Sequence, residues 1–147
     1  MTQSPLDLSQ DFNKNLTALL RQAKVIAVVG LSPKADRASY RVASYLQQAG
    51  YRIIPVRPMT AEILGEPCYA TLDDIPKEIQ VDIVDVFRRA EETPPIAEAA
   101  VRIQAKCLWL QSGILNDTAL SIVTSVGLLG VQDLCLMVEH RRLAQHW

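Results

Sequence analysis

The segment from Gly30 to Tyr40 holds the side chains that are best suited to bind a phosphate group. It follows an apolar, β-branched run and precedes a stretch with helical periodicity. At such a junction, free backbone N–H groups and the positive end of the helix dipole favour an anion. Further donors come from Ser32, Lys34, Arg37 and Ser39. The segment therefore predicts a phosphate-binding loop, and a solvated loop with an ordinary helix cap is the alternative.

The glycine pattern of this loop does not fit the usual dinucleotide fingerprint. GxGxxG needs three closely spaced glycines, whereas Gly30 is followed by no other glycine before Gly50. The acidic residue that commonly binds the ribose of NAD after the second strand is also missing, and Arg57 and Pro58 stand there instead. A guanidinium at this place suits a ribose that carries a phosphate. CoA or NADP is therefore favoured over NAD, with a plain surface arginine as the alternative for Arg57.

Two further segments place polar residues or glycine directly after an apolar run. Residues 81–87 are followed by Arg88, Arg89, Glu91 and Glu92. These charges either line a cleft or solvate the tip of a loop. Residues 107–110 are followed by Gln111, Ser112 and Gly113, and the glycine would let the backbone pass close to a ligand.

The sequence carries no recognisable arrangement of nucleophile and base. It has no GxSxG elbow, no HExxH and no P-loop. His140 stands alone near the C-terminus and is interpreted as a surface or helix-end residue rather than a general base. Asp82 and Asp85 are three apart on an expected strand, so they face opposite sides and do not form a catalytic pair. The cysteines are expected to be reduced and to pack as small hydrophobes: Cys68, Cys107 and Cys135.

The elements that must position these residues alternate between strands and helices. Strands are expected at 24–30, 51–56, 81–87, 107–110 and 131–135, with a short edge strand within 63–70. Helices are expected at 8–23, 39–48, 94–105 and 116–126, with a last turn or two over 138–143. This alternation predicts an α/β, Rossmann-like, doubly wound parallel sheet of about five strands in the order 3-2-1-4-5, with helices on both faces. Ligands bind such sheets at the carboxyl ends of the strands, where the polar segments lie.

Length and composition limit the class of protein. The 147 residues are expected to form one domain over 1–147, with the helix at about 8–23 packed on it, and they leave no room for a separate catalytic domain. The 15 basic and 16 acidic residues nearly cancel, which argues against non-specific nucleic-acid binding. No apolar run reaches the roughly 18–20 residues of a membrane span, and the N-terminus has no secretory signal. We therefore expect a cytoplasmic protein with neither a membrane nor a nucleic acid as its partner.

Several of these stretches together resemble the small single-domain CoA-binding proteins, which are similar to the CoA-binding domain of the succinyl-CoA synthetase alpha subunit. The matching stretches are 26–33, 37–43, 54–58, 63–65, 84–89, 108–113 and 138–140. They are collinear with the family and extend the resemblance over roughly residues 12 to 143.

The resemblance implies that the ADP part of CoA lies over the first loop and contacts the ends of the following strands. The residues implied in the loop are Gly30, Leu31, Ser32, Arg37, Ser39 and Tyr40. Those implied at the strand ends are Arg57, Pro58, Phe87, Arg88, Gln111 and Gly113. Lys34 joins the candidate set because of its place in the loop. The family more often has asparagine or another small polar residue at position 57, and it tends to carry basic residues where this chain has Leu134 and Met137.

We expect a small-molecule nucleotide ligand, CoA or an acyl-CoA, that is bound without catalysis. One alternative is an NADP-binding, reductase-like protein. Another is a sensor or interaction protein with a degenerate nucleotide cleft, which Leu134 and Met137 would suit. The acyl group, the pathway, a homo-oligomer, a partner enzyme and a disulfide between a cysteine and the CoA thiol all stay open.

Overall fold

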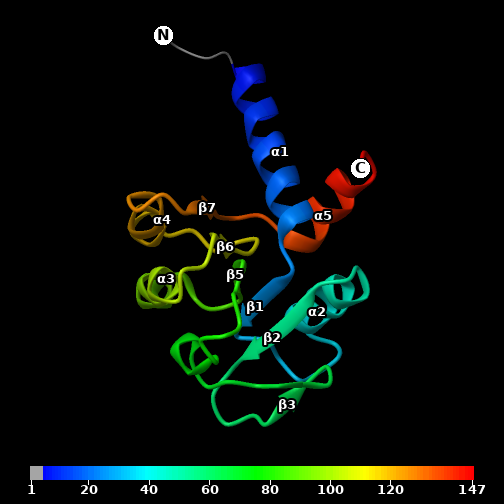
Figure 1. Cartoon of the computed structure of the whole chain (residues 1–147), viewed down its shortest axis with the longest axis vertical. Helices are drawn as coiled ribbons and strands as arrows, with labels where there is room; N and C mark the ends of the chain where they lie inside the picture. The colour runs from blue at the N-terminus through cyan, green and yellow to red at the C-terminus, as the bar shows by residue number, and fades with distance from the viewer. Residues whose placement is uncertain (1–4) are drawn as a thin grey trace.

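Five parallel strands form the central sheet of the computed structural model, which describes the backbone of residues 5–147 and the side chains of residues 11–147 (Figure 1). The strands are β1 (Val25–Val29), β2 (Arg52–Val56), β5 (Ile83–Val86), β6 (Cys107–Leu110) and β7 (Leu129–Val131). Their spatial order is β2-β1-β5-β6-β7, and every neighbouring pair is parallel. The Rossmann-like α/β sheet predicted from the alternating pattern is confirmed.

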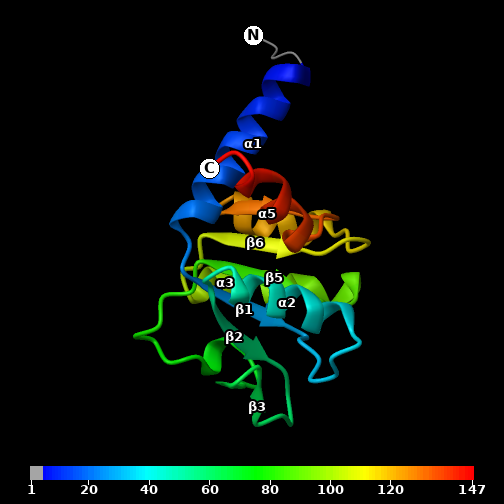
Figure 2. The ribbon, with the colours of Figure 1, turned by 90° about the vertical axis from the view of Figure 1, so that its right-hand side faces the viewer.

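Helices cover both faces of this sheet, which explains why its strands are apolar apart from Arg52 in β2 and Asp85 in β5. The helices are α1 (Pro5–Gln22), α2 (Ala38–Gln48), α3 (Thr93–Arg102), α4 (Asp117–Thr124) and α5 (Leu136–Ala144). One core cluster joins the sheet to α1, α2 and α5, and a second joins it to α3 and α4. Figure 2 shows α2 and α5 on the near face of the sheet. Two 3-10 turns, η1 (Leu72–Asp74) and η2 (Ala90–Glu92), complete the α3 side.

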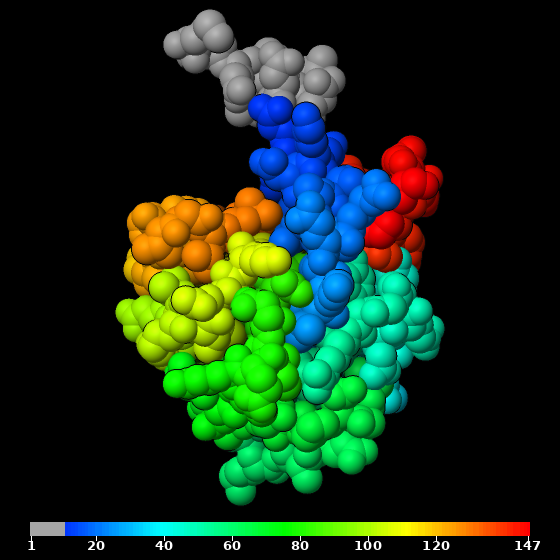
Figure 3. All heavy atoms as spheres, in the orientation of Figure 1, coloured from blue at the N-terminus to red at the C-terminus, as the bar shows by residue number. Residues whose placement is uncertain are grey.

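The outer edge beyond β2 is covered by a hairpin rather than by a full strand. It consists of β3 (Glu62–Ile63) and β4 (Glu66–Pro67), which pair antiparallel with each other. Tyr69 alone forms a parallel bridge to the sheet, at Val56. Pro67 has no N–H to donate, so the expected edge strand over 63–70 is reduced to this bridge. The segment lies at the bottom of Figures 1 and 3.

The last strand lies earlier in the chain than its apolar pattern indicated. It spans Leu129–Val131 instead of 131–135, and Asp133 then adopts a positive φ of 59° that ends the extended conformation. The chain turns there and enters α5 at Leu136. As a result, the carboxyl ends of β6 and β7 and the start of α5 lie at one edge of the sheet. No helix in the described part of the chain is long and apolar enough to cross a membrane.

Candidate functional site

The carboxyl ends of β1, β2 and β5 border a cleft of about 530 Å³, which we call the basic cleft. It is lined by Gly30, Arg57, Pro58, Met59, Thr60, Phe87, Arg88, Arg89 and Glu92. Three guanidinium groups therefore surround it, with one carboxylate among them. Five of the residues predicted to bind the ligand meet here: Gly30, Arg57, Pro58, Phe87 and Arg88.

Gly30 allows the first and third of these strand ends to approach each other closely. Its φ is +86°, and a Cβ at this position would lie 2.4 Å from the carbonyl oxygen of Phe87 and 3.0 Å from Cδ of Arg88. Gly30 N–H donates to the carbonyl of Val56 at 2.9 Å, which ties the loop to β2. Only glycine fits this backbone conformation together with this contact.

The loop after Gly30 uses its hydroxyl groups to hold its own shape. The Ser39 hydroxyl accepts the Ser32 N–H at 2.9 Å, and the Ser32 hydroxyl accepts the Lys34 N–H at 3.1 Å. Lys34 and Arg37 are exposed, Tyr40 is half-buried, and the side chain of Leu31 is buried in the core. Arg37 occupies the N-cap position of α2 without a side-chain hydrogen bond to it. These six predicted residues flank the basic cleft along the chain but do not line it.

Gln111 and Gly113 lie further along the same edge of the sheet. The Gln111 side chain is buried, and its Oε1 accepts the N–H of Leu136 at 3.0 Å, which fixes the start of α5. Gly113 has a φ of +83° and donates its N–H to Asp133 at 2.7 Å. The structure thus places both predicted residues in the β6–α5 junction, beside the basic cleft rather than in its wall.

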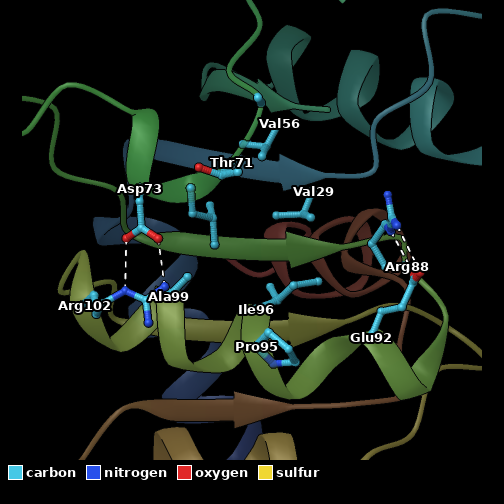
Figure 4. A pocket seen from close by; sticks show the side chains of 12 residues that line it. Val29, Val56, Thr71, Asp73, Arg88, Glu92, Pro95, Ile96, Ala99 and Arg102 are labelled. Atoms are coloured by element: carbon cyan, nitrogen blue, oxygen red, sulfur yellow. Dashed lines mark hydrogen bonds and ion pairs between the residues drawn. The ribbon is translucent and has the colours of Figure 1, made fainter. Parts of the chain in front are cut away.

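A second cavity of about 340 Å³ adjoins the basic cleft on the α3 face of the sheet, and we call it the apolar trough (Figure 4). Its lining residues are Val29, Val56, Ala70, Thr71, Leu72, Asp73, Arg88, Glu92, Pro95, Ile96, Ala99 and Arg102. The close-up shows Val29 and Val56 on one side and Pro95, Ile96 and Ala99 on the other. Arg88 and Glu92 line both cavities, so the trough and the cleft adjoin at this pair of residues.

An ion pair stands at each end of the apolar trough (Figure 4). At one end, Arg102 donates from Nη2 and Nε to the two carboxylate oxygens of Asp73, at 2.8 and 3.1 Å. The Arg102 hydrogen bond lowers the pKa of Asp73 below its ordinary value. At the other end, Arg88 donates from Nε and Nη2 to Glu92 at 2.9 and 3.1 Å. The hydrogen bond from Arg88 lowers the pKa of Glu92 to about 2, and Arg89 contributes in the same direction.

The sequence did not predict the trough, although Arg88 and Glu92, which line it, were among the charges expected either to line a cleft or to solvate a loop tip. Its walls come from α3 and from residues 70–73, which are more than 20 residues apart in the chain. The available signal was the helical spacing of Ile96, Ala99 and Ala100 in a helix that directly follows β5. That spacing shows a small-residue face turned to the sheet, but it does not show the hollow left beside that face.

The two aspartates near the middle of the chain lie in different surroundings, as their spacing predicted. Asp82 accepts the N–H groups of Lys24 and Val25 at 2.8 and 3.0 Å and pairs with Lys106 at 3.3 Å. Asp85 is fully buried in β5, and neither of its carboxyl oxygens has a hydrogen-bond partner among the described residues. This burial raises the pKa of Asp85 well above its ordinary value. Burial of Asp85 therefore disfavours its charged form.

His140 is not at the surface, which corrects that expectation. Only 7% of it is exposed, in the middle of α5, where its Nδ1 lies 2.8 Å from the hydroxyl of Tyr45. The rings of Tyr51 and Trp147 pack edge-on against it. Burial lowers the pKa of His140. Its contact with Tyr45 joins α5 to α2 on the face of the sheet opposite the apolar trough. At this position His140 cannot act as a general base for a ligand in the basic cleft.

The cysteines are free thiols, as predicted, with Cys107 buried and the other two half-buried. Cys68 lies near the basic cleft, where its thiol donates to the carbonyl of Arg57 at 3.5 Å. Burial is the largest effect on this thiol and raises its pKa. Among the side chains of residues 11–147, no group of three or more histidine, cysteine or acidic residues is arranged to hold a metal ion.

The parallel sheet with helices on both faces places the chain in the class of Rossmann-like α/β proteins, which bind their ligands at the carboxyl edge of the sheet, where the basic cleft and the apolar trough lie. Residues 24–141 match the family described as CoA binding domain, and the chain belongs to that family. It is 42% identical over 122 residues to the uncharacterized protein YneT of Bacillus subtilis, covering 83% of this chain and 89% of that protein. A solved structure from Thermus thermophilus superimposes with a TM-score of 0.84 at 38% identity, covering 89% of this chain and 98% of that one.

The chain is also similar to part of a much larger enzyme. It is 33% identical over 63 residues to acetate–CoA ligase (ADP-forming) I of Archaeoglobus fulgidus. The match covers 43% of this chain and 9% of that ligase. The resemblance noted from the sequence motifs is therefore confirmed at the level of the family.

Proposed function

We propose that this protein binds CoA or an acyl-CoA through the ADP part of the ligand, and that it does so without catalysing a reaction. The observation that carries the proposal is that the basic cleft and the apolar trough adjoin at the carboxyl edge of the sheet, with Arg88 and Glu92 lining both. A nucleotide joins a flat apolar base to a chain of phosphates, and these two adjoining cavities have the matching chemistry.

The apolar trough is assigned to the adenine ring. Val29 and Val56 on the sheet and Ile96 on α3 offer apolar surfaces for the two faces of a planar base. Thr71 and Asp73 supply polar groups at its rim, where the edge of a base needs hydrogen-bond partners. Arg88 and Glu92 line both cavities, so a ribose beside Arg88 would connect a base in the trough with phosphates in the basic cleft.

The diphosphate is assigned to the region between Gly30 and the start of α2. The absence of a Cβ at Gly30 lets the carbonyl of Phe87 and the side chain of Arg88 pack against the start of the loop, so the ends of β1 and β5 meet at this subsite. The N-terminus of α2 adds a positive dipole end, and Arg88 adds a guanidinium beside Gly30. Ser32, Lys34, Arg37, Ser39 and Tyr40 then form the outer wall of this subsite, with Leu31 contributing only its backbone.

The ribose 3′-phosphate of CoA is assigned to Arg57. The N–H of this residue donates to the carbonyl of Tyr69 at 2.8 Å, which fixes the backbone at the end of β2. Its half-buried side chain lines the basic cleft beside Pro58. The pantetheine arm would then follow the sheet edge toward Gln111 and Gly113, past Leu134 and Met137. The positions of His140 and Asp85 inside the core support binding rather than proton transfer to a ligand.

Calorimetric titration with CoA, dephospho-CoA and NADPH tests this proposal. We expect CoA to bind most tightly, and removal of the 3′-phosphate to weaken binding by about ten- to a hundredfold, since a charge-assisted contact contributes about 1.5–3 kcal/mol. In the variant Arg57→Gln, CoA and dephospho-CoA should bind almost equally. Failure of all three ligands to bind would refute the proposal. Tighter binding of NADPH than of CoA would favour the reductase-like alternative.

A further inference from the structure

We infer that Glu92 competes with the ligand's diphosphate for the guanidinium of Arg88. This competition sets how tightly the basic cleft binds its ligand and which anions it accepts. The inference rests on the function proposed above. It concerns the ion pair between Arg88 and Glu92, which lies on the boundary between the basic cleft and the apolar trough (Figure 4).

The local sequence explains why Glu92 faces the arginines instead of its own helix. Glu92 is the N-cap residue of α3, and a side chain at this position normally accepts an N–H from the second or third helical residue. Those residues are Pro94 and Pro95, which have no N–H. Accordingly, Glu92 makes no side-chain cap hydrogen bond. Its carboxylate is left to find donors elsewhere, and the nearest are the guanidinium groups that follow β5.

The resulting contacts occupy the same donors that a phosphate would use. Glu92 accepts from Nε and Nη2 of Arg88 at 2.9 and 3.1 Å, and from Nη2 of Arg89 at 3.3 Å. This paired arrangement of two parallel N–H groups is also the one in which arginine binds phosphate oxygens. The low pKa of Glu92 keeps it ionised throughout the physiological range. Before a ligand arrives, Glu92 therefore holds the anion position of Arg88.

A ligand that spans both cavities must pass this ion pair. Cδ of Arg88 lies 3.0 Å from where a Cβ on Gly30 would be, so its side chain adjoins the subsite assigned to the diphosphate. A diphosphate entering there meets the negative charge of Glu92 and a guanidinium whose paired donors are taken. The side chain of Glu92 is 28% exposed and that of Arg88 is 40% exposed, so the carboxylate has solvent into which it can turn.

This arrangement makes the binding of an anion depend on its charge and on whether the rest of the ligand is held in the apolar trough. A diphosphate carries enough charge to replace one carboxylate on Arg88, and its base is held at the same time in the trough. A weakly charged anion gains too little to displace Glu92. A nucleoside without phosphate does not compete for Arg88 at all. The ion pair thus favours an anchored diphosphate over the small anions of the cell.

The test compares Glu92→Gln with Glu91→Gln in the full chain, using calorimetry with CoA, ADP and adenosine. Glutamine keeps the shape of Glu92 and removes its charge, so we expect CoA and ADP to bind about five- to tenfold more tightly. Glu91 is 3.6 Å from Arg89 and its side chain is 70% exposed. Its replacement changes the net charge equally but should alter affinity less than about twofold, as expected for an exposed ion pair. The affinity for adenosine should not change in either variant.

Arg88→Gln and the double variant Arg88→Gln with Glu92→Gln complete a double-mutant cycle. The gain from Glu92→Gln should disappear when Arg88 is absent, because the competition takes place on that guanidinium. Melting temperatures show whether each variant is folded, and Glu92→Ala provides a second neutral variant with the same expected direction. If the unmodified chain binds CoA and both neutral Glu92 variants bind it equally or more weakly, the inference is overturned while the proposed function stands. If neither the unmodified chain nor any variant binds CoA, the proposed function fails.

Discussion

At the scale of single residues, Asp85 shows how a buried carboxyl group links stability to pH. It lies in β5 between Val28 and Trp109 of the neighbouring strands, with no hydrogen-bond partner among the described residues. Burial raises the pKa of Asp85 in the folded chain, so the unfolded chain loses this proton first as the pH rises. The folded state then binds more protons than the unfolded state, and the free energy of unfolding falls with increasing pH.

The variant Asp85→Asn removes this pH dependence. Its stability advantage over the unmodified chain should grow by about 1.4 kcal/mol per pH unit, beginning near the ordinary aspartate pKa of about 4 and ending at the folded pKa of Asp85. Urea unfolding of both proteins at a series of pH values measures the two free energies. As a control, Glu98→Gln on the exposed side of α3 should give a difference that is nearly constant with pH. A constant difference for Asp85→Asn as well would show that Asp85 is ionised in the folded chain.

At the scale of elements, the ends of β1, β2 and β5 can form the cleft only because residue 30 is a glycine. The variant Gly30→Ala would place a Cβ 2.4 Å from a backbone carbonyl, at a φ of +86°. We expect it to lower the free energy of unfolding by about 2–4 kcal/mol, from backbone strain together with overpacking. Gly127 has a similar φ of +89° with no atom within 4 Å of an added Cβ, so Gly127→Ala should cost only about 1–2 kcal/mol. Urea unfolding measures the free energy of unfolding of both variants. If both lose the same amount, the backbone at Phe87 moves to make room for the added Cβ, and the close approach at Gly30 is not required.

The same elements show which parts of the fold and of the site can be predicted from the sequence and which cannot. The sheet could be predicted because its strands are short, mainly apolar runs, and most of them alternate along the chain with segments of helical period. The loop at Gly30 and the arginines at positions 57 and 88 could be assigned to one edge because parallel strands bring their carboxyl ends together. The apolar trough could not be predicted, because it depends on how closely α3 approaches residues 70–73. The contact between Glu92 and Arg88 could not be predicted either. Its two charges are visible in the sequence, but its geometry depends on the two prolines at the start of α3.

At the scale of the whole molecule, a formal net charge of −1 conceals a local concentration of positive charge. Three arginine side chains surround the basic cleft, while acidic residues elsewhere balance them. The long-range field is therefore weak, which disfavours nucleic acid, and the short-range field at the cleft is strong. Salt screens charges over roughly 10 Å at 0.1 M, so a ligand bound by this local cluster should remain sensitive to ionic strength.

Salt dependence of CoA binding distinguishes a local cluster from a general electrostatic effect. Raising the salt concentration from about 0.05 to about 0.5 M should weaken CoA binding several-fold, because the screening length falls from above about 10 Å to nearer 3 Å. The variant Arg57→Gln should show a shallower dependence, since one of the contacts with the ligand's phosphates is lost. Lys106→Gln removes the same charge beside Asp82, at the opposite edge of the sheet, and should leave the dependence unchanged. Calorimetry at four salt concentrations gives the three slopes. Equal slopes for the two variants would show that net charge, rather than the basic cleft, governs the binding of CoA.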